Sequence, residues 1–413
     1  MPVMIAAFIL SYIDRQNVAF AKLQMVSDLG MSEVMYGLGS SLFFIGYIFF
    51  DVPSALAVHR YGARIWIARI MLTWGVITLL LAATHSIGMF YTLRFLLGAA
   101  EAGFYPGSIY YLTLWFPQRY RMRGLGVFTL GAPLGNLLGS LISGPLLELN
   151  GKWGLAGWQW IFIATGIPAL LMACALLLWL PDGPATATFI TINERERLLS
   201  ALQRDMPENV SHGNPLAAIW DVKALSLGLI YMLILTSLYG VTYWLPTIVK
   251  GFGISSRNNG FLNMIPWTAA IILLLVVTPR VRGERAILRF GLISATFGLI
   301  SFIASTAITR PAVRFAAICV GAPCVQILLP SFWSLATRFF KGARAASSIA
   351  VINAVGLLGG FSAQNLMPWV AKLTGSAVMS MMVPATCLTI LALLSLITLW
   401  FTRALPTAVE EVL

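Results

Sequence analysis

Charged residues are scarce in this chain of 413 residues. They make up 10% of the sequence, whereas hydrophobic residues make up 59%, and an ordinary soluble domain carries roughly 25% charged residues. A soluble fold of this size cannot bury so much apolar surface, so the composition indicates a polytopic membrane protein. The net charge of +12 comes from short loops between apolar runs and forms no single basic face, so we expect no nucleic-acid partner.

Cysteine and histidine are also rare. The four cysteines lie in apolar runs without a CxxC spacing, and the three histidines are scattered. These residues are Cys174, Cys319, Cys324, Cys387, His59, His85 and His212. We therefore expect inert thiols, no metal site, no cofactor and no nucleophile–base set of an enzyme.

The second half of the chain lacks acids. Between Asp221 and Glu410 the only acidic residue is Glu284, which falls in a predicted loop. Any proton site made of carboxylates must therefore lie in the first half, where the candidates are Asp14, Asp51 and Glu101. An ionisable side chain within a membrane span is costly and is a candidate functional group by default.

Apolar runs of about 20 residues predict an all-α fold with twelve transmembrane helices. The predicted spans are 3–26, 34–57, 64–83, 87–114, 123–146, 157–180, 222–249, 257–279, 286–307, 312–338, 344–371 and 377–402. A long polar segment, 181–218, separates two predicted six-helix bundles, 1–180 and 219–413. Within this linker, residues 191–199 (TINERERLL) have the pattern of a capped amphipathic helix.

The two predicted bundles resemble each other, which favours a pseudo-symmetric fold. The segments 115–121 (WFPQRYR) and 338–344 (RFFKGAR) lead into the fifth and eleventh spans, so that Arg121 and Arg344 are equivalent. Two similar bundles with a midplane cavity between them are typical of secondary transporters.

Basic residues gather in alternate loops, after the second, fourth, eighth and tenth spans. This asymmetry predicts that both termini and the linker face the cytoplasm of a multi-pass protein in the cell inner membrane. We expect an uncleaved first helix rather than a signal peptide. That helix starts almost at Met1, and whether a short cytoplasmic leader is missing stays open.

Four charged residues within the spans are the main functional candidates. Asp14 and Arg15 are neighbours, so their side chains point about 100° apart on a helix and cannot both serve one partner. We expect Arg94 to pair with Asp14, which leaves Arg15 for a carboxylate ligand. The alternative is a structural ion pair that locks the first helix to the fourth.

Glu101 has no basic neighbour within one helical turn. Burial without a fixed cation favours the neutral carboxyl form, so Glu101 is a candidate proton-coupling residue together with Asp14. The alternative is a protonated acid that only hydrogen-bonds for packing. Asp51, near the end of the second span, is expected to cap a helix or face water.

Uncharged side chains within the spans are candidates for the wall of a substrate cavity. Tyr47, Tyr239, Trp333 and Asn353 interrupt or flank apolar runs. Each alone is more often a packing residue. Asn353 is the most informative, because an unpaired amide in hydrocarbon is costly.

The chain resembles the major facilitator superfamily from end to end, and within it the anion:cation symporter family. The resemblance rests on residues 12–17 (YIDRQN), 52–54 (VPS), 62–69 (GARIWIAR), 100–107 (AEAGFYPG), 115–117 (WFP), 157–160 (GWQW) and Asn353. The loop at 55–64 departs from the superfamily signature, with Ala55 and His59 where glycine and aspartate are usual. Tartrate, rhamnonate, phthalate and hydroxyphenylacetate permeases are the most similar members.

This resemblance implies uptake of an organic acid with protons. It implies that Arg15 binds the substrate carboxylate, that Asp14 and Glu101 carry protons, and that Arg94 pairs with these acids. Tyr47, Tyr239, Trp333 and Asn353 match cavity positions. We expect a monomer in the lipid bilayer whose partners are a small carboxylate, such as a sugar acid, tartrate or an aromatic acid, and protons.

Two alternatives remain at this point. One is an organic-anion exchanger that uses no protons, and the other is a non-transporting membrane sensor. The sequence does not fix the carboxylate or the ratio of protons to substrate.

Overall fold

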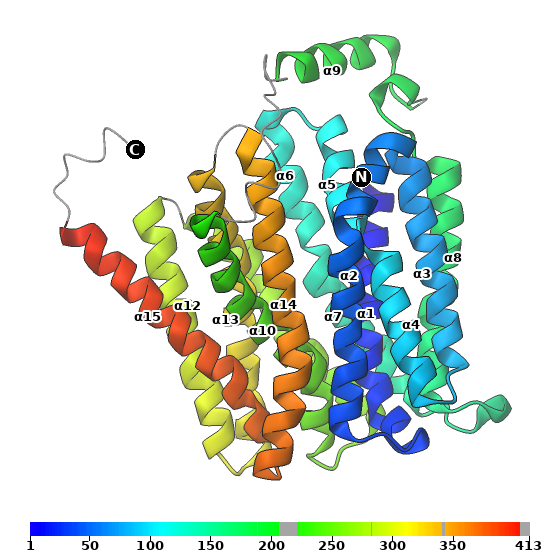
Figure 1. The fold of residues 1–413 in the computed structure, drawn as a ribbon, viewed down its shortest axis with the longest axis vertical. Helices are drawn as coiled ribbons and strands as arrows, with labels where there is room; N and C mark the ends of the chain where they lie inside the picture. Colours follow the sequence, from blue (N-terminus) through cyan, green and yellow to red (C-terminus); the bar gives the residue numbers. More distant parts are fainter. Residues whose placement is uncertain (188, 206–220, 282, 341–342, 405–413) are drawn as a thin grey trace. The chain divides into compact units, whose positions relative to one another are not determined.

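The computed structural model describes residues 1–187, 189–205, 221–281, 283–340 and 343–404. These residues form helices and no strand (Figure 1). The α-helices are α1 (Pro2–Asp28), α2 (Glu33–Tyr61), α3 (Ala63–Ala82), α4 (Ile87–Glu101), α5 (Phe104–Trp115), α6 (Gln118–Thr129), α7 (Gly131–Leu147), α8 (Gly157–Trp179), α9 (Ile192–Arg204), α10 (Val222–Lys250), α11 (Ser256–Val276), α12 (Glu284–Ala307), α13 (Pro311–Ala336), α14 (Ala343–Thr374) and α15 (Met382–Ala404).

The all-α membrane fold predicted from the sequence is confirmed. Ten helical segments among the described residues are long and apolar enough to cross a membrane. The predicted spans 3–26 and 87–114 are not among these ten. The first corresponds to α1, where the polar run 14–17 lowers the hydropathy, and the second is divided into two short helices.

The fourth predicted span is not a single helix, which corrects the sequence prediction. The fourth span ends as α4 at Glu101 and restarts as α5 at Phe104, because Ala102 leaves the helical region with a ψ of 140° and Gly103 adopts a left-handed φ of 81°. The fifth span is divided into α6 and α7 around Leu130. The break after Glu101 leaves backbone groups without helical partners, which only surrounding protein can satisfy at membrane depth.

The amphipathic linker helix is confirmed as α9. Thr191 is its N-cap, and its hydroxyl oxygen accepts a hydrogen bond from the backbone N–H of Glu194 at 3.3 Å. Glu194 completes the capping box by accepting the Thr191 N–H at 2.9 Å. Within its own unit, α9 lies across the end of the helices near α5 (Figure 1). The remainder of the predicted linker, from residue 206 to 218, lies outside the described residues.

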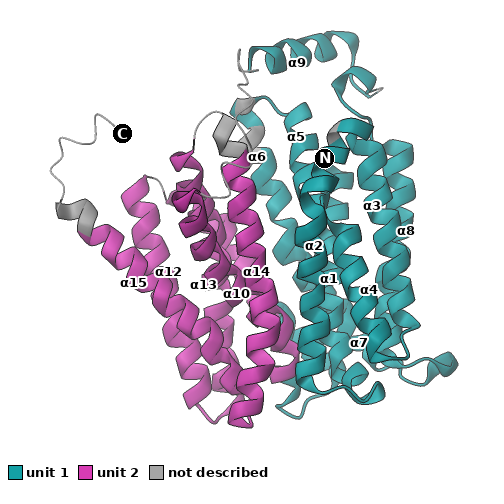
Figure 2. Ribbon diagram, in the orientation of Figure 1, with its two compact units in different colours: residues 1–210, 249–264 teal, residues 211–248, 265–413 magenta. Residues whose placement is uncertain are grey.

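The chain divides into two compact units (Figure 2). Unit 1 comprises residues 1–210 and 249–264, and unit 2 comprises residues 211–248 and 265–413. Each unit has its own core of fully buried aromatic side chains, such as Trp74 in unit 1 and Trp267 in unit 2.

Glycines bring the helices of each unit into backbone contact. A Cβ atom on Gly135 of α7 would lie 2.7 Å from the Ile9 carbonyl oxygen of α1, and one on Gly359 of α14 would lie 2.3 Å from the Met232 carbonyl oxygen of α10. Ile9 and Met232 are separated by the same offset as Arg121 and Arg344, and the two glycines differ from that offset by a single position. The same close approach therefore occurs at equivalent places in both units.

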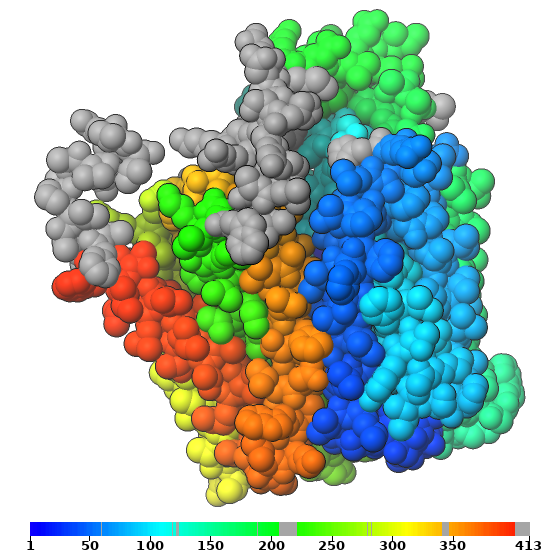
Figure 3. Space-filling view, viewed as in Figure 1, coloured from blue at the N-terminus to red at the C-terminus, as the bar shows by residue number. Residues whose placement is uncertain are grey.

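α2 and α4 also pack closely through a glycine, and this contact positions the candidate site. A Cβ atom on Gly98 would lie 1.9 Å from the Phe43 carbonyl oxygen. In Figure 3 the side chains of α2 (blue) and α4 (cyan) meet without an intervening element. Since Gly98 is one turn before Glu101, this contact brings the end of α4 close to the middle of α2.

Candidate functional site in unit 1

Three helices of unit 1 present the charged candidates and their partners. Asp14 and Arg15 lie in the middle of α1, Arg94 lies in α4, and Glu101 is the last residue of α4. The ring of Phe43 in α2 contacts both arginines. Asp14, Arg94 and Glu101 are buried, with 2%, 1% and 0% of their surface exposed. Uncompensated charges at such positions are unfavourable, so the partners of each side chain decide what the site can do.

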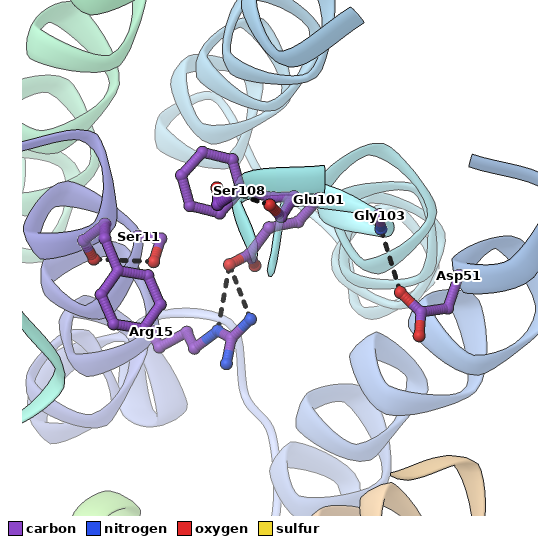
Figure 4. A network of polar contacts seen from close by, with 8 residues as sticks. Ser11, Arg15, Asp51, Glu101, Gly103 and Ser108 are labelled. Carbon is purple, nitrogen blue, oxygen red and sulfur yellow. Dashed lines mark hydrogen bonds and ion pairs between the residues drawn. The ribbon is translucent and has the colours of Figure 1, made fainter. Parts of the chain in front are cut away.

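Arg15 and Glu101 form a buried ion pair (Figure 4). Glu101 Oε1 accepts hydrogen bonds from Arg15 Nε at 3.0 Å and from Arg15 Nη2 at 2.8 Å. The side chain of Arg15 is 11% exposed and that of Glu101 is fully buried. The expectations that Glu101 lacks a cation and that Arg15 is free for a ligand are therefore wrong for this conformation. They failed because Glu101 finds its cation on another helix.

One oxygen of the Glu101 carboxyl group remains without a hydrogen bond. Glu101 Oε2 is buried and has no partner among the residues that the structure describes. A buried carboxylate oxygen without a donor is unfavourable as an anion. Oε2 is therefore the atom at which a proton can be added without breaking an existing hydrogen bond.

Aromatic rings surround the Arg15 guanidinium. Its central carbon lies 5.2 Å from the ring centre of Tyr12, 5.6 Å from that of Phe43 and 5.5 Å from that of Tyr47. Cation–π contacts hold the guanidinium plane without using its N–H donors. Two of these donors, Nε and Nη2, bond to the Glu101 carboxylate.

Asp14 faces away from Arg15, as neighbouring positions on a helix require. Its Oδ1 accepts hydrogen bonds from Asn17 Nδ2 at 2.8 Å and from Thr78 Oγ1 of α3 at 3.1 Å. Asn17 also donates to Thr165 Oγ1 of α8 at 2.9 Å. Asp14 is therefore embedded in a neutral polar network that joins α1, α3 and α8.

The predicted ion pair between Arg94 and Asp14 is not formed among the described contacts. Arg94 instead lies over the ring of Phe43, 4.9 Å from its centre, and Nη2 donates to the Ser40 carbonyl oxygen at 3.5 Å. Arg94 comes from α4, and α4 packs on α2 rather than directly on the face of α1 that carries Asp14. The guanidinium groups of Arg15 and Arg94 therefore both contact the ring of Phe43.

The candidates in unit 2 are aromatic or amide side chains. Tyr239 of α10 is buried and makes an edge contact with Tyr243, with ring centres 6.1 Å apart. Trp333 of α13 makes an edge contact with Tyr231 at 5.1 Å. Asn353 lies half-buried in α14. These three residues belong to unit 2, whereas the charged candidates belong to unit 1.

Several residues of the site were not singled out from the sequence. Phe43 lies one turn before Tyr47 on α2, and Tyr12 lies three residues before Arg15 on α1, so helical spacing from a known candidate was the available signal. Thr78 and Thr165 carry no such signal. A single threonine in an apolar span usually bonds to its own helix, and only the packed fold shows that Thr78 meets Asp14.

The site suits proton and anion chemistry. No group of three or more His, Cys, Asp or Glu side chains that could hold a metal ion occurs within the described part of the chain. The site contains the Arg15 guanidinium in a fixed orientation and the Glu101 carboxylate, which neutralises it. It also contains the Asp14 carboxylate, whose hydrogen-bond partners are neutral. Such a set can exchange one carboxylate for another on Arg15 and can bind or release protons.

The chain is similar in sequence and in fold to known membrane transporters. The profile described as Major Facilitator Superfamily matches residues 4–364. A relative from Acinetobacter baumannii named a quinolone resistance transporter is 42% identical over 365 residues, 87% of this chain and 84% of the relative. A relative from Agrobacterium vitis whose name describes a tartrate transporter is 38% identical over 413 residues, 99% of this chain and 91% of the relative.

A third relative and two solved structures extend the comparison. The inner membrane transport protein RhmT of Escherichia coli strain K12 is 34% identical and covers 88% of this chain and 85% of its own. A bacterial homologue of the human lysosomal transporter Spinster, inward-facing and occupied, has a TM-score of 0.72 at 16% identity, covering 96% of this chain and 95% of its own. A D-xylose–proton symporter has a TM-score of 0.72 at 16% identity, covering 95% of both chains. At this identity the solved structures show a shared fold.

Proposed function

The chain belongs to the major facilitator superfamily, and from that membership we propose that it imports a small organic anion together with protons by alternating access. Superfamily members are multi-pass membrane transporters and not enzymes. The proposed substrate is a sugar acid, tartrate or an aromatic carboxylate. In the proposed arrangement the protein is a monomer of the cell inner membrane with both termini in the cytoplasm.

The buried Arg15–Glu101 pair carries this proposal. A substrate carboxylate that binds Arg15 takes the place of the Glu101 carboxylate. Glu101 would then be a buried anion without a cation, and leaving one member of a buried pair in this state costs roughly 3–5 kcal/mol. A proton on Glu101 Oε2 removes that cost. Substrate and proton therefore bind cooperatively, and the coupling is reciprocal.

Asp14 is proposed as a second proton-coupling residue. Its carboxylate accepts hydrogen bonds from the neutral donors of Asn17 and Thr78, so its charge is stabilised less strongly than that of a carboxylate bonded to a guanidinium. A change of its protonation would alter the contact of α1 with α3. If more positive than negative charge enters per cycle, each net charge gains about 2.3 kcal/mol per 100 mV of membrane potential.

The other candidates have proposed roles in holding the substrate. Tyr47 beside Arg15 would cover an apolar part of the anion, and Arg94 behind Phe43 would add positive potential to the site. Tyr239, Trp333 and Asn353 of unit 2 are proposed as further substrate-binding residues. Aromatic walls with a few placed polar groups are the usual composition of a small-molecule site.

Uptake into proteoliposomes tests the proposal. With an inward-directed proton gradient, the wild type should concentrate its substrate. Glu101→Gln should lower this proton-driven uptake about 100-fold, because the variant cannot exchange a proton as the anion binds. Exchange of labelled for unlabelled substrate across the membrane should continue in Glu101→Gln, since it requires no net proton movement.

A matched control is Glu284→Gln, which removes the exposed carboxylate at the start of α12 that pairs with Arg338. It should leave uptake unchanged. If Glu101→Gln still responds to an imposed pH gradient like the wild type, proton coupling at Glu101 is refuted and a proton-independent exchanger is the better description.

The substrate is tested with a panel of aldonates, tartrate and aromatic carboxylates, each as a stabilising ligand in thermal unfolding and as a transported solute. A quinolone carboxylate belongs in the panel because a 42% identical relative is named for quinolone resistance. Binding to Arg15 predicts that Arg15→Lys lowers the affinity for the active compound about tenfold or more, because the two-point guanidinium contact is lost. A panel without any stabilising or transported compound would contradict the carboxylate assignment.

A further inference from the structure

The break between α4 and α5 begins directly after Glu101 and has a cap from another helix. Asp51 of α2 accepts a hydrogen bond through Oδ1 from the backbone N–H of Gly103 at 3.1 Å (Figure 4). Gly103 is the N-cap of α5, so this N–H is one of the donors that have no partner within the helix. A carboxylate at this end also has a favourable interaction with the dipole of α5.

The same face of α2 closes the break sterically. A Cβ atom on Gly103 would lie 2.2 Å from Ser54 Oγ. Ser54 is three residues after Asp51, and its hydroxyl accepts a hydrogen bond from Trp66 Nε1 of α3 at 2.9 Å. Gly103 therefore has little freedom to move toward α2, and Asp51 fixes the direction of its N–H.

The equivalent region of unit 2 has neither the break nor the cap in its described helices. At the offset that relates Arg121 to Arg344, Glu101 corresponds to Cys324 and Asp51 corresponds to Leu274. Cys324 lies within α13, which runs without interruption from Pro311 to Ala336. The buried acid, the helix break behind it and the carboxylate cap therefore occur together in unit 1 and have no counterpart in α11 and α13.

We propose that Asp51 is a positioning residue that holds the α4–α5 break and thereby fixes where Glu101 meets Arg15. The proposal rests on the proposed function in so far as the Arg15–Glu101 pair couples protons to the anion. Asp51 acts through the backbone N–H of Gly103, two residues beyond Glu101. Its carboxylate has to accept a hydrogen bond, and it does not have to gain or lose a proton.

Two variants separate positioning from proton carrying. Asp51→Asn keeps an oxygen acceptor at the Oδ1 position and cannot titrate, whereas Asp51→Ala has no acceptor. A positioning role predicts that Asp51→Asn retains proton-driven uptake near the wild-type level and that Asp51→Ala loses it about tenfold, the effect of a lost hydrogen bond to a charged group. If Asp51 carries a proton, both variants should lose uptake equally.

Hydrogen exchange of the peptide that covers residues 101–107 gives a readout that is independent of transport. In the full-length protein, Asp51→Ala should exchange about tenfold faster there, and Asp51→Asn should stay close to the wild type. Leu274→Ala, the change at the equivalent position of unit 2, is the matched control and should leave this peptide unchanged. Unaltered exchange in Asp51→Ala, or equal loss of uptake in both Asp51 variants, would overturn the proposal.

Failure of this proposal is distinguishable from failure of the proposed function. If the wild type shows no proton-driven uptake, the coupling function fails, but the exchange measurement still decides whether Asp51 holds the break. If the wild type is proton-driven and Asp51→Ala behaves as the wild type in both readouts, only the positioning role is refuted.

Discussion

The two units repeat one another in backbone packing and differ in the chemistry they bury. In both, a glycine of α7 or α14 meets a carbonyl group of α1 or α10. The carbonyl groups are equivalent in the internal repeat, and the glycines are one position from equivalence. The four charged candidates of unit 1 have uncharged residues at the equivalent positions of unit 2. Asp14, Arg15, Arg94 and Glu101 correspond to Ser237, Leu238, Ala317 and Cys324.

This difference separates what the fold requires from what the function requires. Since unit 2 forms the same kind of helical bundle without a buried charge among its described residues, the charges of unit 1 are not needed to build a bundle of this type. Buried ion pairs contribute little net stability compared with apolar side chains of similar volume. Their concentration in one unit therefore agrees with the proposed proton coupling at Asp14 and Glu101.

The largest effect is expected when a charge is moved into unit 2. Cys324→Glu places a carboxylate at the position equivalent to Glu101. No basic residue occurs within seven positions of Cys324 in the sequence, so the new charge has no cation within two turns of its own helix. Thermal unfolding in detergent should show a destabilisation of about 3 kcal/mol or failure to fold.

The matched control for this change is Cys324→Gln, which has the same shape and no charge. It should be milder than Cys324→Glu, and Glu101→Gln in unit 1 should remain folded. Equal stability of Cys324→Glu and Cys324→Gln would mean that unit 2 accommodates a buried acid as readily as unit 1. This result would contradict the proposed difference between the units.

A smaller effect, similar in the two units, is expected at the paired glycines. Gly135→Ala and Gly359→Ala each put a methyl group less than 3 Å from a backbone carbonyl oxygen, so two helices must separate. Each should lower the free energy of unfolding by about 1–3 kcal/mol. Gly126→Ala and Gly291→Ala, where nothing lies within 4 Å, are the controls in each unit. A loss of stability in only one member of the Gly135–Gly359 pair would show that the repeat is not equivalent in packing.

The comparison of the two units also shows which features can be predicted from the sequence. Long apolar runs predicted the membrane helices, and the pattern at 191–199 predicted α9 with its cap, because both signals are local. The buried charged residues could also be identified from the sequence, because an ionisable residue within an apolar run is a local signal. The internal repeat was visible from the two short segments that end at Arg121 and Arg344.

The partner of each charge was not predictable, because it depends on the rotation and packing of helices far apart in sequence. Arg15 and Glu101 lie on helices that are separated in the chain by α2 and α3, and nothing local distinguishes this pair from Arg94 with Asp14. The break after Glu101 did have a local signal. Pro106 follows Gly103 by three positions, and proline is well tolerated in the first turn of a helix because its missing N–H would have no helical partner there.

A more modest change is expected when Trp333, a proposed substrate contact in unit 2, is altered. Trp333→Phe keeps an aromatic ring and shortens it, and the edge contact with Tyr231 is weakened. Loss of an aromatic contact with the substrate costs about 0.5–1.5 kcal/mol, so the KM of uptake should rise roughly two- to tenfold. The response to the proton gradient should stay as in the wild type, because the proposed coupling residues are all in unit 1. A changed proton dependence in Trp333→Phe would place part of the coupling in unit 2.

The smallest effect is expected at Glu194, a carboxylate outside the membrane whose surroundings contrast with those of Glu101. Glu194 is exposed in α9, and the hydrogen bonds that it accepts from the backbone and hydroxyl of Thr191 lower its pKa below the ordinary value of 4.5. Because the folded pKa is depressed, its contribution to α9 is complete above the ordinary value. That contribution is lost as the pH falls through the lower folded value. Hydrogen exchange in α9, corrected for the intrinsic effect of pH, should therefore increase below pH 4.5 in the wild type.

Glu194→Gln retains the shape of the cap and removes the titration. Its α9 should exchange at a rate that does not depend on pH in this range, while the peptides of α4 and α5 should be the same in both proteins. Acid sensitivity of α9 that persists in Glu194→Gln would assign it to another group of the linker. The contrast with Glu101 follows from the surroundings of each carboxylate. Water and a helix terminus stabilise the anion at Glu194, whereas the anion at Glu101 depends on one guanidinium, for which a substrate carboxylate can compete.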